Sequence, residues 1–270
     1  MPPKPSSQGR TVTKEVLIDA PVEAVWKALT DAEELKRWFP LEARVEPGAG
    51  GSIFLSWGAD CEGTAGISVW EPNRRFRWIE RSPFAEKGGT EHMAVEWILE
   101  ARGGKTLLRL VNSGFAAPGE DWANEYHDSV DYGWGFMLAN LRFYLERHAG
   151  QPRRVAWPRH KVSISREEAF ERLTAPGGFF VAGLAGGKPG DPCRLRTTTG
   201  EACEGRIEFY FPPRGFCICA ESLGDSLLWA TLEGTPGKIE VQLWLSAYTL
   251  GPEQVREIGD HWQDALRKIF

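Results

Sequence analysis

Apolar and polar residues alternate in short runs through most of the first half of the chain. Residues 11–18 (TVTKEVLI) alternate well enough to predict a β-strand. Between Leu41 and about Ser113, glycine and proline separate five further runs that predict antiparallel strands: SIFLSW, GISVWEP, RRFRWIER, EHMAVEWILEA and KTLLRLVNS. The paired glycines of RGGK at 102–105 predict a tight hairpin between the last two.

Helical spacing flanks this strand region on both sides. After Asp19 and Pro21, which offer a capping residue and a first-turn proline, an amphipathic helix is predicted from the spacing of Val22, Val25, Trp26 and Leu29. Thr30 and Glu33 form a Thr-x-x-Glu capping box, which predicts a second short helix ending at Trp38-Phe39. Residues 119–148 contain no proline and predict one long amphipathic helix.

These elements predict an α+β unit in which an antiparallel sheet curves round a long terminal helix, because no other element is large enough to cover one sheet face. A chain of 270 residues with 42% apolar content can form two such units. We expect a disordered tail at residues 1–10, a first domain with a ligand cavity at 11–148, a proline- and arginine-containing linker at 149–158 and a degenerate, mainly structural second domain at 159–270.

The second domain repeats motifs of the first. Four segment pairs match at separations of 144, 140, 133 and 128 residues: VWKALT with AFERLT, PNRRF with PPRGF, GKTLLRLVNS with GKIEVQLWLS, and GWGFMLANL with HWQDALRKI. Chance matches would scatter, whereas a steadily falling separation indicates a duplication whose second copy has shorter loops. That copy has PGGFFVAGLAGGKPGD in place of EELKRWF, which predicts a flexible loop or a short edge strand at 179–181. Its terminal helix is expected to begin near Pro252 and to lack about three N-terminal turns that the long helix of the first copy has.

Charge, hydropathy and cysteine content argue against nucleic-acid binding, membrane insertion and a disulfide framework. The net charge of −5 comes from interleaved acids and bases without a basic block, so nucleic acid is not an expected partner. No apolar run reaches the length of a membrane span, and residues 1–10 lack a signal-peptide pattern, so we expect a cytoplasmic protein without membrane insertion. Five cysteines, an odd number, predict reduced thiols.

Several of these motifs together resemble a known family. APVEAVWKALTDAEELKRWF, PGAGGSIF, RGGKTLLRLVNSGF and the GW-plus-leucine pattern of the long helix are similar to the SRPBCC (START-like / polyketide cyclase) superfamily, and within it to the branch of activator of heat-shock protein 90 ATPase homologues. The resemblance implies two tandem helix-grip domains with an apolar cavity between sheet and helix. It also implies a chaperone as an alternative partner. Many relatives carry a histidine where this chain has Asn112, which places any inherited acid–base role in doubt.

The expected function is binding of an apolar or amphipathic small molecule, lipid- or polyketide-like, in the first domain. Strand alternation places Ile53 on the same face as two of the candidates. The candidate ligand-binding residues are Leu55, Trp57, Phe76, Trp78, Val95, Trp97, Leu108, Leu110, Asn112, Trp122, Tyr126 and Val130. Each of them is also a plausible core residue on its own.

Other chemistries have weaker support. A cyclase- or hydrolase-like enzyme would need a titratable donor in the cavity, for which Asn112, Tyr126, Glu80 and His92 are the candidates. The cluster Glu120, Asp121, His127, Asp128 and Asp131 offers only one nitrogen ligand and predicts a solvated helix face rather than a metal site. The glycine runs lack the Gly-Lys-Ser/Thr end of a phosphate loop, and neither Ser113 nor Cys61 has a nucleophile signature. No cofactor is expected.

Overall fold

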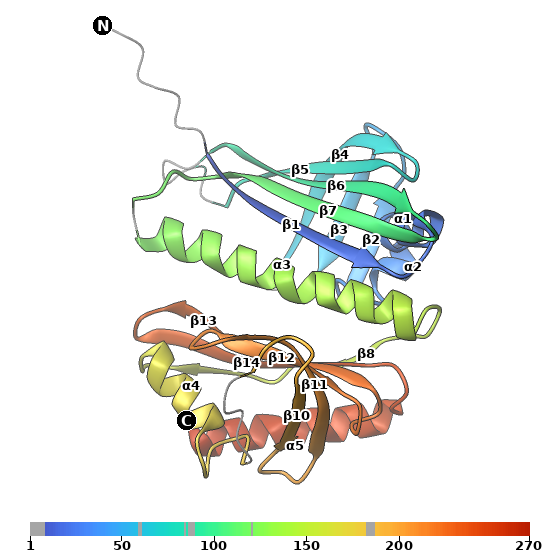
Figure 1. Ribbon diagram of the computed structural model, residues 1–270. Helices are drawn as coiled ribbons and strands as arrows, with labels where there is room; N and C mark the ends of the chain where they lie inside the picture. The colour runs from blue at the N-terminus through green and yellow to red at the C-terminus, as the bar shows by residue number, and fades with distance from the viewer. Residues whose placement is uncertain (1–8, 59–60, 84, 86–89, 120, 182–186) are drawn as a thin grey trace, which may run out of the picture. The chain divides into compact units, whose positions relative to one another are not determined.

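The computed structural model describes residues 9–58, 61–83, 85, 90–119, 121–181 and 187–270. The chain divides into two compact units, Met1–Gly150 and Gln151–Phe270. Each unit has its own antiparallel sheet of seven strands (Figure 1). No helix among the described residues is long and apolar enough to cross a bilayer.

The sheet of the first unit has the strand order β1-β7-β6-β5-β4-β3-β2, with every neighbouring pair antiparallel. Its strands are β1 (Arg10–Ile18), β2 (Glu42–Glu46), β3 (Ser52–Ser56), β4 (Glu62–Glu71), β5 (Arg75–Arg81), β6 (His92–Arg102) and β7 (Lys105–Phe115). The sheet bends round the long helix α3 (Asp121–Arg147), which runs along one of its faces (Figure 1). The predicted helix-grip architecture is therefore confirmed.

Most predicted elements of this unit are confirmed, with two corrections at its margins. The hairpin at 102–105 forms as predicted, with positive φ at both Gly103 and Gly104. Strand β2 was not predicted, because EARVE has a single buried residue and little apolar signal. Arg10, assigned to the tail, is the first residue of β1, and its guanidinium donates to the carbonyl oxygens of Ala116 and Ala123.

The caps of the two short helices differ from the prediction. Helix α1 (Val22–Thr30) has Pro21 at its N-cap, and Asp19 instead pairs with Lys105 at 2.8 Å. Helix α2 (Ala32–Leu35) is capped by Asp31, whose carboxylate accepts from two backbone N–H groups at 3.0 Å. Thr30 is still helical and donates to the Trp26 carbonyl, so the predicted capping box is wrong by one residue.

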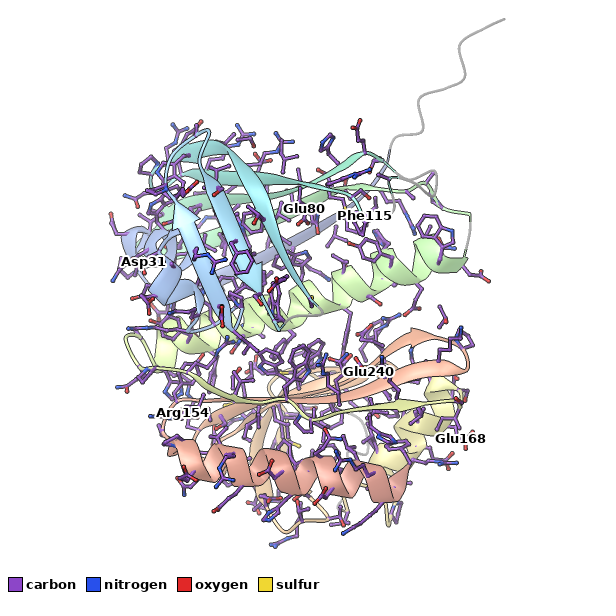
Figure 2. The ribbon with its side chains drawn as sticks, turned by 180° about the vertical axis from the view of Figure 1, so that it is seen from behind. Asp31, Glu80, Phe115, Arg154, Glu168 and Glu240 are labelled. Carbon is purple, nitrogen blue, oxygen red and sulfur yellow. The ribbon has the colours of Figure 1, made fainter. Side chains whose placement is uncertain are left out.

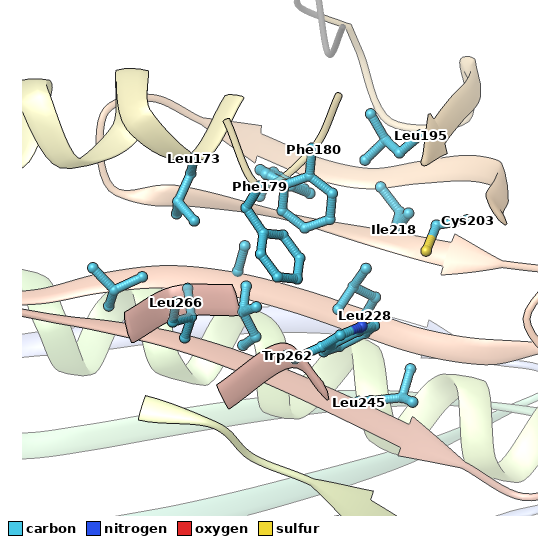
Figure 3. Packing of buried hydrophobic residues seen from close by; sticks show 14 of the residues in the cluster. Leu173, Phe179, Phe180, Leu195, Cys203, Ile218, Leu228, Leu245, Trp262 and Leu266 are labelled. Atoms are coloured by element: carbon cyan, nitrogen blue, oxygen red, sulfur yellow. The ribbon is translucent and has the colours of Figure 1, made fainter. Parts of the chain in front are cut away.

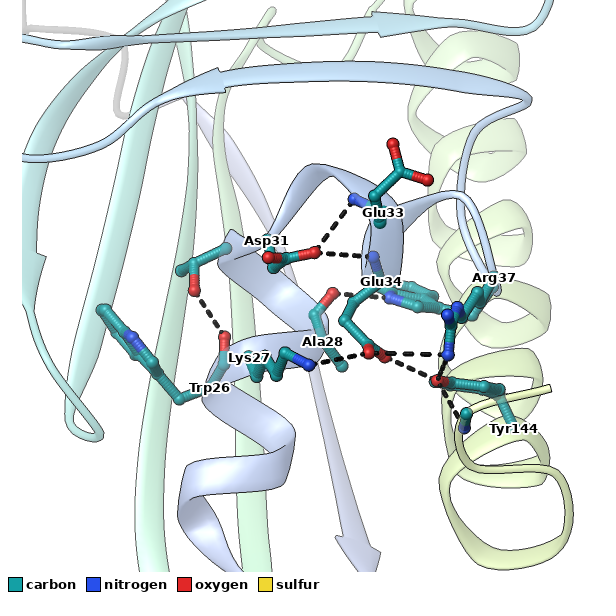
Figure 4. A network of polar contacts seen from close by, with 11 residues as sticks. Trp26, Lys27, Ala28, Asp31, Glu33, Glu34, Arg37 and Tyr144 are labelled. Carbon is teal, nitrogen blue, oxygen red and sulfur yellow. Dashed lines mark hydrogen bonds and ion pairs between the residues drawn. The ribbon is translucent and has the colours of Figure 1, made fainter. Parts of the chain in front are cut away.

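A polar network fastens α2 to the C-terminal end of α3 (Figure 4). The Tyr144 hydroxyl donates to Glu34 at 2.5 Å and accepts from the Gly150 backbone N–H at 3.0 Å, and Glu34 also pairs with Lys27 at 3.1 Å. Asn140 of α3 donates to the carbonyl of Trp38, the residue before Phe39. These contacts fix α2 and Trp38 against α3, and so also fix the position of Phe39, the next residue.

The second unit has the sheet order β10-β11-β12-β13-β14-β8, with β9 also paired to β14. Its elements are β8 (Arg154–Ala156), β9 (Arg159–Val162), α4 (Arg166–Thr174), β10 (Pro192–Arg196), β11 (Ala202–Phe211), β12 (Gly215–Ala220), β13 (Ser226–Thr235), β14 (Lys238–Ala247) and α5 (Pro252–Ile269). Because β8 pairs with β14, residues 154–156 belong to this sheet and the predicted linker 149–158 is too long.

Local irregularities recur in both units at the predicted separation. A register shift interrupts β4–β5 pairing after Ile67, and another interrupts β11–β12 pairing after Ile207, 140 residues later. In the turns that follow, the N–H groups of Arg74 and Arg214 donate to equivalent carbonyls at 3.0 and 2.9 Å. A β-bulge occurs at particular positions of particular sheets. Its recurrence 140 residues later in the second sheet therefore confirms the duplication.

The second copy differs where its loop replaces α2 and β2. Phe180 forms an isolated bridge to Thr197, so the predicted short edge strand at 179–181 is reduced to one bridge, and residues 182–186 lie outside the described part of the chain. The side chains of Phe179 and Phe180 are fully buried. Figure 3 shows both rings between the sheet and α5, where Phe179 meets Trp262 edge-on at 5.8 Å between ring centroids. These two rings fill the space beneath the helix.

The length of α5 corrects a second expectation, that the second copy lacks about three N-terminal turns of the long helix. Helix α3 has thirteen residues before Trp134, and α5 has ten before the equivalent Trp262. The difference is less than one turn. The tight packing of the second unit therefore comes from Phe179 and Phe180 rather than from a shortened helix.

Glu201 joins α5 to the β10–β11 turn. Its carboxylate accepts from the hydroxyls of Thr197 and Thr199 and from Trp262 Nε1 at 3.1 Å. Burial of the carboxyl acts to raise its pKa, but the hydrogen bonds from Thr197, Thr199 and Trp262 outweigh burial, and the pKa of Glu201 is lowered. The ionised form is thus the one that the fold stabilises.

We expect the stability contributed by Glu201 to depend on pH. A carboxyl with a lowered folded-state pKa contributes fully above its ordinary pKa near 4.5, and the contribution disappears as the pH falls through the lower folded-state value. Urea unfolding should show Glu201→Gln less stable than the parent at pH 7, with the gap narrowing as the pH falls below 4.5. A gap that stays constant over that range would contradict this role.

Candidate functional site

A cavity of about 630 Å³ lies in the first unit between the sheet and the N-terminal half of α3. Its walls come from strands β3 to β7, from Phe39 just after α2, and from α3. They comprise Phe39, Ile53, Leu55, Trp57, Cys61, Glu62, Gly63, Thr64, Ala65, Trp78, Glu80, Arg81, Pro83, Met93, Val95, Asn112, Tyr126, Val130, Gly133, Trp134 and Met137. Cavities of this volume with mostly apolar walls and a few polar groups are typical of small-molecule sites.

Strand register explains why these side chains converge. Trp78 pairs with Val95 across β5 and β6, and Val95 pairs with Asn112 across β6 and β7, so the three lie side by side on one sheet face. On the helix, Tyr126, Val130 and Trp134 follow one another at i, i+4 and i+8 and face the same way. The alternation visible in the sequence is therefore the direct cause of the apolar wall.

Seven of the twelve predicted residues line this cavity: Leu55, Trp57, Trp78, Val95, Asn112, Tyr126 and Val130. The other five, Phe76, Trp97, Leu108, Leu110 and Trp122, do not line it. Phe76, Trp97, Leu108 and Leu110 have no exposed surface and form solid core at the other end of the same strands, because α1 and α2 cover that end. Whether the seven bind a ligand is a separate prediction.

Several lining residues escaped the sequence analysis. The apolar ones are Phe39, Ala65, Pro83, Met93, Trp134 and Met137. Alternation places Ile53 on the correct strand face, but it is not among the twelve candidates. Phe39 stacks on Trp134 with ring centroids 5.4 Å apart, a contact between residues far apart in sequence. The i, i+4 spacing of Val130 and Trp134 could have identified Trp134 as a lining residue. The same spacing also fits a helix residue packed in the core, so it does not decide between the two.

Asn112 is a buried connector. Its Nδ2 donates to the Ala94 carbonyl at 3.1 Å, and its Oδ1 accepts from Trp134 Nε1 at 3.0 Å. The amide thus fixes the indole that forms part of the cavity wall. Its bonds are directed into the protein, so its position orients Trp134 rather than offering a free group to a ligand.

Replacing Asn112 by alanine should destabilise the protein by about 1–3 kcal/mol, because Trp134 Nε1 and the Ala94 carbonyl would lose their partner in a buried site. Urea unfolding at neutral pH measures this loss. Ser113→Ala, one residue along the strand, is the matched control and should change the free energy of unfolding by less than about 0.5 kcal/mol. Equal effects of the two variants would refute the connector role.

Burial shifts the pKa of two groups in the cavity wall, Glu80 and Tyr126. Burial raises the pKa of the Glu80 carboxyl. Burial, together with the nearby charges of Glu80 and Cys61, raises the pKa of Tyr126 to about 12, so its hydroxyl stays protonated at neutral pH. The Tyr126 hydroxyl contacts Met93 Sδ at 3.6 Å. A carboxyl and a phenol hydroxyl are thus present in the otherwise mostly apolar wall.

The other candidates for chemistry do not assemble into a site. His92 is exposed and is not among the residues that line the cavity. In the acidic cluster of α3, His127 contacts Asp128 at 3.1 Å and Asp131 pairs with Lys14 at 2.8 Å, and Glu120 lies outside the described residues. Over the described ranges no group of His, Cys, Asp and Glu side chains is arranged to hold a metal ion.

The sequence and fold of the first unit correspond to a known family. Residues 19–146 match the model of the activator of Hsp90 ATPase homolog 1-like protein family. The first unit is therefore similar to this family over most of its length. The match spans α1 to the end of α3 and so contains nearly all of the cavity-forming elements. A search among curated proteins found no match to the chain.

Solved structures show similar folds at low identity. The Aha1 dimer from Colwellia psychrerythraea is 18% identical over 52% of this chain and 99% of its own, with a TM-score of 0.45. CalU16 from Micromonospora echinospora is 26% identical over 53% of this chain and 81% of its own, with a TM-score of 0.41. The di-domain ARO/CYC BexL from the BE-7585A biosynthetic pathway is 16% identical over 96% of this chain and 94% of its own, with a TM-score of 0.45.

Proposed function

We propose that the protein binds one apolar or amphipathic small molecule in the cavity of its first unit. The supporting observation is the cavity itself, about 630 Å³ in volume and walled by aromatic and aliphatic side chains. Leaving such a volume empty forgoes the packing that a core normally gains. In the second unit, phenylalanine rings occupy the space between sheet and helix, which supports a specific role for the hollow in the first.

The second unit is proposed to act mainly as a structural partner. A hollow of about 360 Å³ there is lined by mostly polar residues of α5 and the β10–β11 turn: Thr198, Thr199, His261, Asp264, Ala265, Lys268 and Ile269. The equivalents of Asn112 and Trp78 are Leu245 and Ile218, which are fully buried core. The second unit thus has aliphatic core side chains where the first has the amide that orients Trp134 and an indole that lines the cavity.

Titration with a fluorescent fatty-acid or polyketide analogue tests the binding proposal. Uptake should saturate at one molecule per chain, because the cavity has room for one guest of that size. Absence of uptake for apolar probes of every class would remove support for the cavity and favour an interaction role, which the family name suggests through its reference to Hsp90.

A further inference from the structure

The cavity wall contains a carboxyl group, that of Glu80 (Figure 2), for which the described residues provide no partner. Glu80 lies two residues after Trp78 on β5, so both side chains point to the cavity face of the sheet. Among the described residues no side chain or backbone group donates a hydrogen bond to Glu80, and no cation pairs with it. Burying a carboxyl without a hydrogen-bond partner costs folding free energy, so its presence here needs an explanation.

Among the described residues of the cavity wall, no cation forms an ion pair with this carboxyl. Arg81 also lines the cavity, but it is the next residue on the strand, where alternation turns consecutive side chains to opposite faces. No ion pair joins it to Glu80, and burial is the only cause that raises the Glu80 pKa. The remaining titratable groups of the wall are Cys61, Glu62 and Tyr126, none of which is positive. Glu62 already accepts a hydrogen bond from Ser56 at 3.2 Å. Apart from Arg81, the described titratable groups of the wall are thus negative or neutral.

Aromatic rings surround the same space. Phe39, Trp57, Trp78, Tyr126 and Trp134 all line the cavity, and the faces of such rings attract cations. Phe39 is in ring contact with both Trp57 and Trp134, at 5.0 and 5.4 Å between centroids. An unpaired carboxyl among aromatic rings is chemically suited to an organic cation.

The second unit has no carboxyl at the position equivalent to Glu80. The residue 140 positions later, at the separation set by the shared bulge, is Ala220, which is fully buried in the second unit. The carboxyl therefore occurs in the copy with the cavity, and the copy whose interior is filled has a methyl group instead. This difference is expected if Glu80 serves a guest.

We propose that the cavity selects amphiphiles that carry one protonated amine, with the ammonium group bound by Glu80 and the apolar body held between the aromatic walls. The ammonium donates a hydrogen bond to the carboxylate, and charge-assisted bonds of this kind are stronger than neutral ones. This inference rests on the proposed binding function and specifies the class of ligand.

Calorimetric titration of the full chain with octylammonium, 1-octanol and octanoate tests this assignment. The three probes share one chain length and differ in head-group charge. We expect octylammonium to bind at least about tenfold more tightly than octanol, and octanoate to bind at least about tenfold more weakly than octanol. In Glu80→Gln the preference for octylammonium over octanol should fall to about threefold or less.

Glu96→Gln is the matched control, because Glu96 lies on the neighbouring strand β6 and pairs with Arg75 away from the cavity. It should retain the parental preference. Octanol binding as tightly as octylammonium, or a preference that survives Glu80→Gln, would overturn the amine assignment while leaving the binding function intact. Absence of binding for all three probes would overturn the binding function, and the amine assignment with it.

Discussion

Replacing Val130 by tryptophan should lower the affinity for any cavity probe by at least about tenfold while leaving the protein folded. Val130 lines the cavity from α3, so the larger indole can enter empty space instead of displacing neighbours. The expected change in the free energy of unfolding is below about 1 kcal/mol, because overpacking costs arise only where no space is available. Probe titration and urea unfolding of the same preparation measure the two quantities.

Leu110→Trp is the control for this variant. Leu110 has no exposed surface and does not line the cavity, so the larger side chain would have to displace its neighbours. We expect it to cost about 1–3 kcal/mol of stability. If Val130→Trp costs as much as Leu110→Trp, or if it leaves uptake unchanged, the space beneath α3 is not a binding cavity.

The largest loss of stability is expected from Trp262→Ala in the second unit. The indole has no exposed surface, contacts Phe179 and donates its N–H to Glu201. Truncating a buried tryptophan to alanine costs about 3–5 kcal/mol, through lost apolar burial and the void that remains. Denaturant unfolding followed by far-ultraviolet circular dichroism should show an early transition of the second unit.

Trp262→Phe separates packing from hydrogen bonding at this position. It keeps most of the ring contact and removes the N–H donated to Glu201, so the expected loss is about 1–3 kcal/mol. A Trp262→Ala variant no less stable than Trp262→Phe would show that the ring is not a main element of this core.

The architecture was predictable because its signals are local. Strand alternation, the proline-free helix and the glycine pair at 103–104 each depend on a few neighbouring residues, and the duplication depends on repeated motifs. The missed elements have weak local signals. Strand β2 has one buried residue, and β8 has three residues in a segment rich in arginine and proline.

The cavity was only partly predictable, because its limits depend on contacts between distant segments. Alternation identified the correct sheet face, but it cannot tell Trp78, which borders empty space, from Phe76 two residues earlier, which is covered by Trp26 at 6.2 Å. The role of Asn112 likewise depends on Trp134, 22 residues away along the chain and reached only through the fold. Sequence patterns define faces, and tertiary packing decides which part of a face remains open.

Methionine methyl signals offer the most direct test of the cavity. The chain has three methionines, and two of them, Met93 and Met137, line the cavity from the sheet and from the helix. In a chain labelled with ¹³C-methyl methionine, an apolar probe should shift both signals together and saturate at one equivalent, and Val130→Trp should abolish the shifts. Signals of Met93 and Met137 that remain unchanged at saturating concentrations of neutral, cationic and anionic amphiphiles would contradict the binding function.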